Sequence, residues 1–268
     1  KDYKVFQNNS AGFGKFIKWV HVHNTNGPAL EVVMEATGVY HEKFAHFLYK
    51  NKYKVVIVMP NKIANYTKTL NLKTITDKTA SEAICKFGLK HNLDSWKPSD
   101  PILKKVQQLT RERSQIIAER TIISNQIHSE KIEAFPNKRS LKRMETRKNI
   151  LEKQEAEVDK ELKDLVASEE TLKSRVKRML TIPGVGLLTA ATILGETNGF
   201  EHIRNKRQLV SYAGLDVVQK QSGTSINRKT KISKKGNVYL RKALFFPAFS
   251  AVNSKGFCKN LQQRISND

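Results

Sequence analysis

The chain has few cysteines and no long apolar run, and each shortage excludes a class of protein. Cys85 and Cys258 are its only cysteines in 268 residues, too few for a disulfide framework or a four-thiolate zinc site. The longest apolar run, residues 243–252, is interrupted by Pro247 and is too short to cross a bilayer. No glycine-rich Walker loop is present, so ATP chemistry has no support. The sequence therefore predicts a protein of the reducing cytoplasm without a membrane segment.

Acidic residues are also scarce, and the imbalance points to a polyanionic partner. Lys and Arg number 48 against 25 Asp and Glu, which gives a formal net charge of +23, and the hydrophobic content of 39% is sufficient for a core. Between Asp216 and Asp268 no acidic residue occurs. The basic residues that begin this stretch are Lys220, Arg228, Lys229, Lys231, Lys234, Lys235, Arg241 and Lys242. Because cations that neutralise phosphates release counterions, we expect nucleic-acid contact here rather than a merely solvated face.

The first hundred residues alternate between strand-like and helix-like patterns. Residues 29–35 and 54–59 are short β-rich runs, and residues 39–52 between them are amphipathic. A strand, a crossover helix and a strand of this length predict a right-handed parallel unit. Further helices are expected at 12–20, 61–70 and 78–91, with residues 4–6 ending an earlier hairpin.

Glycine is absent from residues 102–178, and proline occurs there once, at Pro136. Apolar residues recur every seven positions, at Leu109, Ile116 and Ile123 and then at Met144, Leu151, Val158, Leu165 and Leu172. This spacing predicts two long helices of a coiled-coil arm, folded back at residues 135–137 or zipped to a second chain. The arm is either a spacer between domains or a dimerisation element.

Residues 182–190 place two glycines between an amphipathic and an apolar helix. Gly184 and Gly186 would let the backbone approach a phosphate at the start of the second helix, as in a helix–hairpin–helix element. The alternative is an ordinary tight turn between packed helices.

Two carboxylates are candidates for metal chemistry. Glu35 ends an otherwise apolar strand, and Asp77 stands at a helix start, where it could also be an N-cap. A carboxylate at position 80 would share the helical face of Asp77 and complete a hard-oxygen site, but the residue there is Ala80. Glu82 points elsewhere around the helix.

Ser222 is a candidate nucleophile. It lies beside Gly223 and before the basic run, so its hydroxyl would be accessible and cations could neutralise a pentacovalent phosphate. An ordinary polar loop is the alternative interpretation.

Several motifs follow one another in a characteristic order. They are residues 34–40 (Met-Glu-Ala-Thr-Gly-Val-Tyr), 76–80 (Thr-Asp-Lys-Thr-Ala), 109–113 (Leu-Thr-Arg-Glu-Arg), 182–186 (Ile-Pro-Gly-Val-Gly), 212–215 (Tyr-Ala-Gly-Leu), 222–223 (Ser-Gly) and 232–237 (Ile-Ser-Lys-Lys-Gly-Asn). Over nearly its whole length the chain resembles insertion-sequence transposases with a RuvC-like DEDD domain and a C-terminal serine-bearing domain. Their relatives include pilin-gene invertases and bridge-RNA-guided recombinases.

The resemblance implies an α/β plus α architecture of three parts. Residues 1–100 would form a RuvC-like domain of the RNase-H fold, 101–178 the helical coiled-coil arm, and 179–268 a mainly helical transposase domain with the helix–hairpin–helix element. The family's opening strand, which carries its first Asp, is missing from this sequence, and we expect the true N-terminus to lie upstream of Lys1.

The resemblance also implies the chemistry. Glu35 and Asp77 match two of the four acidic residues that hold Mg²⁺, and Ala80 stands at the position of the family's last Asp, which points to an inactivated variant. Ser222 matches the serine that forms a covalent phosphoserine with DNA, and Ser225 is the less favoured alternative. The implied nucleic-acid-binding residues are Gly184, Gly186, Arg228, Lys229, Lys231, Lys234, Lys235, Asn237 and Arg241. The implied partners are double-stranded donor and target DNA, a structured guide RNA, and further copies of this chain in a homodimer or homotetramer. In such an oligomer the carboxylates and the serine would meet across protomers in a composite site. The implied location is the cytoplasm, in association with the nucleoid.

Two other functions remain open from the sequence. A RuvC-like junction nuclease would hydrolyse DNA with metal ions and would need no serine. A non-catalytic scaffold that binds RNA and DNA would account for Ala80.

Overall fold

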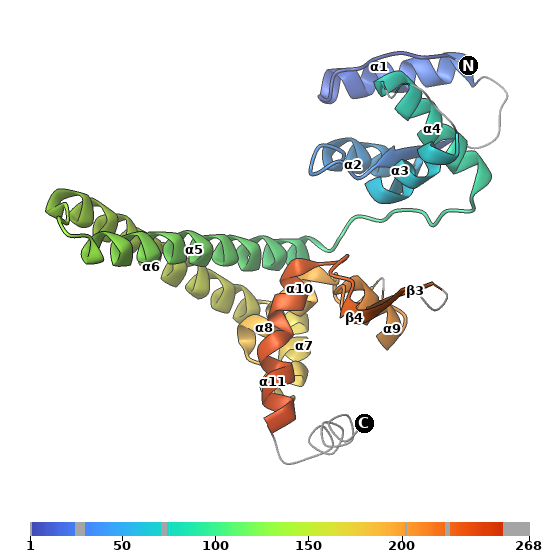
Figure 1. The fold of residues 1–268 in the computed structure, drawn as a ribbon. Helices are drawn as coiled ribbons and strands as arrows, with labels where there is room; N and C mark the ends of the chain where they lie inside the picture. Colours follow the sequence, from blue (N-terminus) through green and yellow to red (C-terminus); the bar gives the residue numbers. More distant parts are fainter. Residues whose placement is uncertain are drawn as a thin grey trace. The chain divides into compact units, whose positions relative to one another are not determined.

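The computed structural model describes residues 2–24, 30–70, 74, 76–201, 203–222 and 226–253, without the side chains of residues 220, 222, 226–228 and 252. The chain divides into two compact units, residues 1–98 and 99–268 (Figure 1). No helix in these ranges is both long and apolar enough to cross a membrane.

The first unit is built on a parallel pair of strands, as the sequence predicts. β1 (Glu31–Glu35) and β2 (Lys54–Val58) pair in register from Glu31 opposite Lys54 to Glu35 opposite Val58. The crossover between them contains α2 (Glu42–Lys50). The other helices of the unit are α1 (Ser10–His23), α3 (Pro60–Thr69) and α4 (Asp77–Lys90). Residues 4–6 form no strand, so the expected end of an earlier hairpin is wrong.

Helices cover both faces of this small sheet because β2 is apolar on both sides. Val56 and Val58 pack with Ile63 of α3 and Phe87 of α4. Val55, pointing the other way, packs with Ala45 and Leu48 of α2 and with aromatic side chains of α1. Burial on both faces explains why this strand is an almost unbroken run of Val and Ile.

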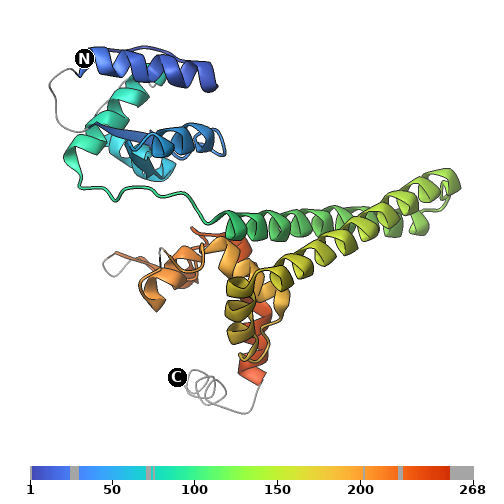
Figure 2. The same ribbon diagram turned by 180° about the vertical axis from the view of Figure 1, so that it is seen from behind.

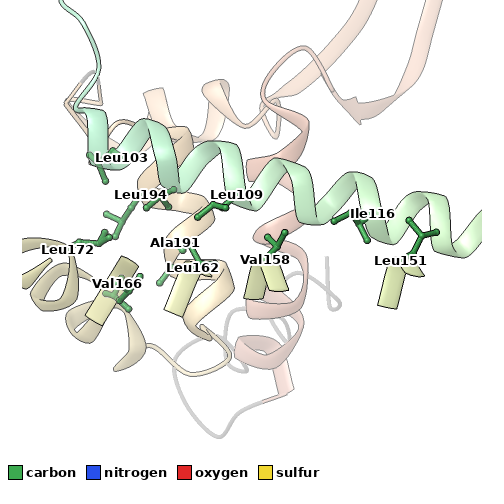
Figure 3. Close-up of a cluster of buried hydrophobic side chains, with 13 residues drawn as sticks. Leu103, Leu109, Ile116, Leu151, Val158, Leu162, Val166, Leu172, Ala191 and Leu194 are labelled. Atoms are coloured by element: carbon green, nitrogen blue, oxygen red, sulfur yellow. The ribbon is translucent and has the colours of Figure 1, made fainter. Parts of the chain in front are cut away.

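The second unit is dominated by a helical hairpin. α5 (Pro101–Ile132) and α6 (Lys138–Ser168) are folded back on each other through residues 133–137 and seen from both sides in Figures 1 and 2. Leu109 and Ile116 of α5 meet Leu151 and Val158 of α6 in one core (Figure 3). The seven-residue apolar pattern is therefore closed within the chain, which decides between the two arrangements left open by the sequence.

The row of buried apolar residues between α5 and α6, which we call the seam, departs from strict seven-residue spacing beyond Val158. Leu162 and Val166 are buried there, while the expected Leu165 is only partly buried. At this end α6 shares its core with α8 (Leu187–Glu196), so its buried face widens beyond one stripe. Arg113, also on the seam, forms ion pairs with Asp159 and Glu155 of α6, at 2.6 and 2.8 Å.

The remaining elements include a hairpin that the sequence analysis did not expect. They are α7 (Glu170–Leu180), α9 (Lys206–Tyr212), β3 (Val217–Ser222), β4 (Ile226–Ile232), α10 (Val238–Ala243) and α11 (Phe245–Asn253). β3 and β4 pair antiparallel, so part of the basic run forms a strand. The expectation of a mainly helical region was incomplete because charge concealed the period-two pattern of Thr230 and Ile232 between lysines.

A buried carboxylate joins several segments of the second unit. The Glu196 side chain, at the end of α8, has no solvent exposure. It accepts hydrogen bonds from Arg111 Nε and Nη2, both at 2.7 Å, from Asn237 Nδ2 at 2.6 Å and from Gln107 Nε2 at 3.3 Å. We call these four residues the Glu196 cluster. Four donors compensate for the desolvation that a buried charge incurs.

The Glu196 cluster holds two loops against the helices. Tyr212 Oη donates to the Glu196 backbone carbonyl at 3.0 Å, and the backbone N–H of Asn237 donates to the Tyr212 carbonyl at 2.7 Å. Between them the backbones cross so closely that a Cβ on Gly236 would lie 2.4 Å from the Gly214 nitrogen. Glycine is thus required at position 236 by this crossing. The motifs at 109–113, 212–215 and 232–237 converge at this place.

The two partners of the Arg111–Glu196 ion pair should contribute unequally to stability. The Arg111 side chain is 41% exposed, whereas the Glu196 side chain is fully buried. Arg111→Ala strands a buried carboxylate and should cost about 3–5 kcal/mol of unfolding free energy. Glu196→Gln leaves a guanidinium that can turn to water, so its cost should be smaller. Urea unfolding of both variants measures this order, and an equal or reversed order would contradict it.

Candidate functional site

Glu35 lies where the sequence predicted it, at the end of β1. Its backbone is opposite Val58, and the ladder continues one residue further, with the Ala36 amide donating to the Val58 carbonyl at 2.9 Å. The side chain is partly buried, and one carboxylate oxygen lies 3.5 Å from Thr37 Oγ1. A contact this long barely restrains the carboxylate, which leaves its oxygens available to a ligand.

Asp77 begins α4, but it is not the N-cap. Thr76 takes that role in a capping box, accepting from the Thr79 amide at 3.3 Å while Thr79 Oγ1 accepts from the Thr76 amide at 2.8 Å. The capping interpretation of Asp77 is therefore wrong. Its exposed carboxylate makes no ion pair with any residue that the structure describes.

The residues present do not complete a magnesium site. Glu35 and Asp77 supply the oxygen ligands that Mg²⁺ prefers, but one turn after Asp77 the side chain of Ala80 is a methyl group. Across the described ranges no group of three or more His, Cys, Asp or Glu side chains is positioned to hold a metal ion. The two carboxylates fit the chemistry of Mg²⁺, and the ligand set falls short at position 80.

Ser222 is the last residue of β3 rather than part of an open loop. Its backbone pairs with Ile226, and two positions earlier Lys220 pairs with Arg228. The expected loop placement is corrected in this respect, since the serine lies on a paired ribbon. Its side chain, Gly223 and the alternative Ser225 lie outside the described residues.

Exposed lysines follow the serine along the chain. Lys229 and Lys231 on β4 and Lys234 and Lys235 after it are all exposed. Lys234 has a left-handed backbone (φ 54°), and its backbone N–H donates a hydrogen bond to the Gly214 carbonyl at 3.0 Å. Such a conformation costs about 1 kcal/mol or more for a residue with a Cβ. The surrounding loops thus fix the backbone of Lys234 in this conformation.

Asn237 and Arg241, two other predicted nucleic-acid contacts, are engaged inside the protein. Asn237 belongs to the Glu196 cluster, and its Oδ1 caps α10 by accepting from the Leu240 amide at 2.9 Å. Arg241 donates from Nη1 to the Ala213 carbonyl at 2.7 Å. Both side chains therefore have structural partners that the sequence did not reveal. The side chain of Arg228 is not described.

The two glycines between α7 and α8 differ in environment. Gly184 has φ +82°, and a Cβ there would lie 2.5 Å from the Cβ of Ser250 on α11. Gly186 is the N-cap of α8, without a side-chain cap, and a Cβ there would meet nothing within 4 Å. Packing therefore explains Gly184, while the amides beyond Gly186 begin a helix that no side chain caps.

Sequence reasoning missed the Glu196 cluster altogether. The signal was present, because Glu196 directly follows the apolar run 187–195 and a charge at the end of such a run requires a buried partner. Arg111 was part of a recognised motif, but its partner is 85 residues away. No local spacing rule reaches that distance.

Comparison with known proteins identifies the family of the chain. A family model described as a transposase, of the DEDD type of IS110, matches residues 2–136, and one described as the transposase IS116/IS110/IS902 family matches residues 176–263. The chain is 31% identical over 246 residues to the pilin gene-inverting protein of Moraxella bovis, covering 91% of this chain and 74% of the relative. The corresponding protein of Moraxella lacunata gives the same identity and coverage.

A more distant relative is the transposase for insertion sequence element IS1328 of Yersinia enterocolitica, 24% identical over 75% of this chain and 66% of the relative. The two family matches together span the carboxylates of the first unit and the basic hairpin of the second. The chain therefore belongs to the IS110/IS116 family of transposases, and is a DNA transposase or recombinase with a RuvC-like DEDD domain.

Proposed function

We propose that this protein recombines the DNA of a mobile element through a covalent phosphoserine at Ser222, directed by a structured RNA. The observation that carries the proposal is the β3–β4 ribbon. Its register puts Ser222 at the end of a strand whose partner contributes Arg228, Lys229 and Lys231. A hydroxyl on a ribbon that also carries several cations is suited to attack on a phosphodiester, because the transition state gathers negative charge on phosphate oxygens.

The proposed step is a transesterification. The Ser222 oxygen forms a bond to phosphorus, the bond from phosphorus to one sugar oxygen breaks, and the serine proton is transferred so that the leaving oxygen departs as a hydroxyl. One phosphoester replaces another, so the bond energy needed for rejoining is retained. The reverse attack by a sugar hydroxyl on the phosphoserine then joins strands and restores the serine.

Phosphate contacts are proposed for the exposed lysines around the ribbon and for the amides that follow Gly186. The backbone of Lys234 is held by the crossing of two loops, so binding a phosphate there costs mainly side-chain entropy. The start of α8 carries a partial positive charge and unpaired amides. These groups would bind the backbone of either nucleic acid without reading its sequence.

The proposed partners are double-stranded donor and target DNA, a guide RNA and further copies of this chain. The support for RNA guidance and for a homodimer or homotetramer is the resemblance to bridge-RNA-guided recombinases. The formal charge of +23 is consistent with binding several nucleic-acid strands. In such a system base pairing supplies sequence specificity, and the protein contacts mainly the backbone.

Mg²⁺ is the proposed cofactor, with Glu35 and Asp77 as two of its ligands. When bound, it would polarise the scissile phosphate. Because Ala80 leaves the ligand set short, we propose that this chain is impaired in cleavage relative to one with Asp at that position.

The covalent step can be tested with a DNA substrate that traps the protein–DNA adduct, resolved on a denaturing gel. We expect Ala80→Asp to increase adduct formation, and Ser222→Ala in that background to abolish it, while Ser225→Ala preserves it. Cleavage that persists without Ser222 would indicate the junction nuclease instead. Absence of cleavage both in the unaltered chain and in the Ala80→Asp variant would favour the non-catalytic scaffold.

The metal proposal has a test independent of activity. Ala80→Asp should tighten Mg²⁺ binding in isothermal titration calorimetry, because it returns a carboxylate one turn from Asp77. Ser81→Asp is the matched control: it adds the same charge to α4 but points about 100° further round the helix. Equal tightening by both variants would mean that charge alone is responsible and would contradict the site.

The phosphate contacts predict a change in salt dependence. Replacing Lys234 and Lys235 by Gln should weaken duplex binding similarly for all sequences and reduce the slope of log K against log salt by about 2. Lys160→Gln with Lys163→Gln, an equal charge change on exposed residues of α6, should leave the slope nearly unchanged. A sequence-selective loss, measured by fluorescence anisotropy, would show that these lysines read bases instead.

A further inference from the structure

The end of the α5–α6 hairpin has a composition unlike that of its middle. Residues 131–148, which we call the hairpin tip, hold seven basic and two acidic residues, whereas residues 152–164 of α6 hold three basic and six acidic ones. The tip projects beyond the other helices of the second unit (Figures 1 and 2). Solubility alone does not require such segregation, since mixed charges solvate a helix equally well. A concentration of positive charge at the exposed end indicates a polyanionic ligand.

Three cations of the tip are left available by the fold. Arg139, Lys142 and Arg143 are exposed and lie on the side of α6 turned away from buried Met144. They make no ion pair with any side chain in the described parts of the chain. Neighbouring Lys131, by contrast, is paired with Glu145 at 3.3 Å. The cations on this face are therefore available to a ligand.

An aromatic side chain stands in the turn that precedes these cations along the chain. Phe135 is 92% exposed. The turn does not depend on it, because Glu130 accepts from the Asn137 amide at 2.7 Å and Asn137 caps α6 by accepting from the Arg139 and Ser140 amides at 3.1 Å each. A phenyl ring with no packing role inside the chain offers a flat surface on which an unpaired base can stack.

We propose that the hairpin tip is a second nucleic-acid-binding site, which takes an unpaired base on Phe135 and its flanking phosphates on Arg139, Lys142 and Arg143. Cations that track a backbone, combined with an aromatic platform, are the arrangement by which proteins hold single-stranded segments and loops. The proposal goes beyond the recombination chemistry, since it concerns binding alone and does not require Ser222.

The experiment compares three labelled probes bound to the full chain: an RNA stem–loop, a DNA stem–loop of the same sequence, and the fully paired duplex of the same stem. Phe135→Ala should weaken binding of a stem–loop by about tenfold, the value of one stacked base, and leave the duplex unaffected. The stem–loop that loses more affinity, RNA or DNA, identifies the source of the unpaired base. Ile132→Ala, at an exposed apolar residue of the same end, is the matched control and should change nothing.

The charge contribution is tested by a matched pair of triple variants. Replacing Arg139, Lys142 and Arg143 by Gln should lower the salt slope for a stem–loop by about 2, as expected for three lost single-strand phosphate contacts. Replacing Lys153, Lys160 and Lys163 by Gln makes the same charge change on the mixed-charge part of α6 and should have little effect.

Three results would overturn the proposal: equal losses in both triple variants, no loss in either, or a Phe135→Ala variant that changes oligomeric mass by light scattering while binding every probe normally. The last outcome would make the tip a protein contact. Because binding is measured without strand transfer, Ser222→Ala should retain tip binding, so failure of the phosphoserine mechanism and failure of the tip site are distinguishable.

Discussion

The second unit depends on the compensation of one buried negative charge. The Glu196 carboxylate is removed from water completely, and it remains stable there because Arg111, Gln107 and Asn237 direct donors at it. Hydrogen bonding to Glu196 raises the pKa of Arg111 above its ordinary value, so the guanidinium stays charged. The donors come from α5 and from Asn237, the residue that caps α10. Because hydrogen bonds to one charge require defined directions, they fix the positions of these helices and loops more closely than apolar packing would.

That fixation matters for the function of the family. The Tyr212–Leu215 and Ile232–Asn237 segments flank the β3–β4 hairpin, and both are bonded to the Glu196 cluster or to each other. The role that we propose for the ribbon, presenting cations and a nucleophilic serine to DNA, requires a rigid base, because a misplacement of about 1 Å can cost a hundredfold in rate. The buried carboxylate thus carries out no chemistry itself and positions the part of the chain that we propose does.

Acidic and basic residues are concentrated in different parts of this protein. Acidic residues are concentrated where helices pair, as with Glu155 and Asp159 opposite Arg113, and they are absent from residues 217–267. The α5–α6 hairpin is therefore acidic in its middle and basic at its tip. Positive surface occurs at the ribbon and at the tip, where exposed cations such as Lys234 and Arg143 make no ion pair with an acidic residue in the described ranges.

The sequence by itself determined the local elements of the first unit and the long helices. The parallel β1–β2 pair, its crossover helix and the apolar seam of α5 and α6 follow from periodicity, because each pattern has one matching geometry. The recognised motifs likewise predicted the family. Tertiary structure alone decided that the seam closes within one chain, that the basic run includes a strand, that Thr76 rather than Asp77 caps α4, and that Asn237 turns inward. The closure of the seam and the inward turn of Asn237 depend on contacts between residues far apart in the chain, and a local pattern carries no information about which distant group will satisfy a buried charge such as Glu196. The cap at Thr76 is a contact with Thr79, only three residues away, and it was the structure that distinguished it from a cap by Asp77.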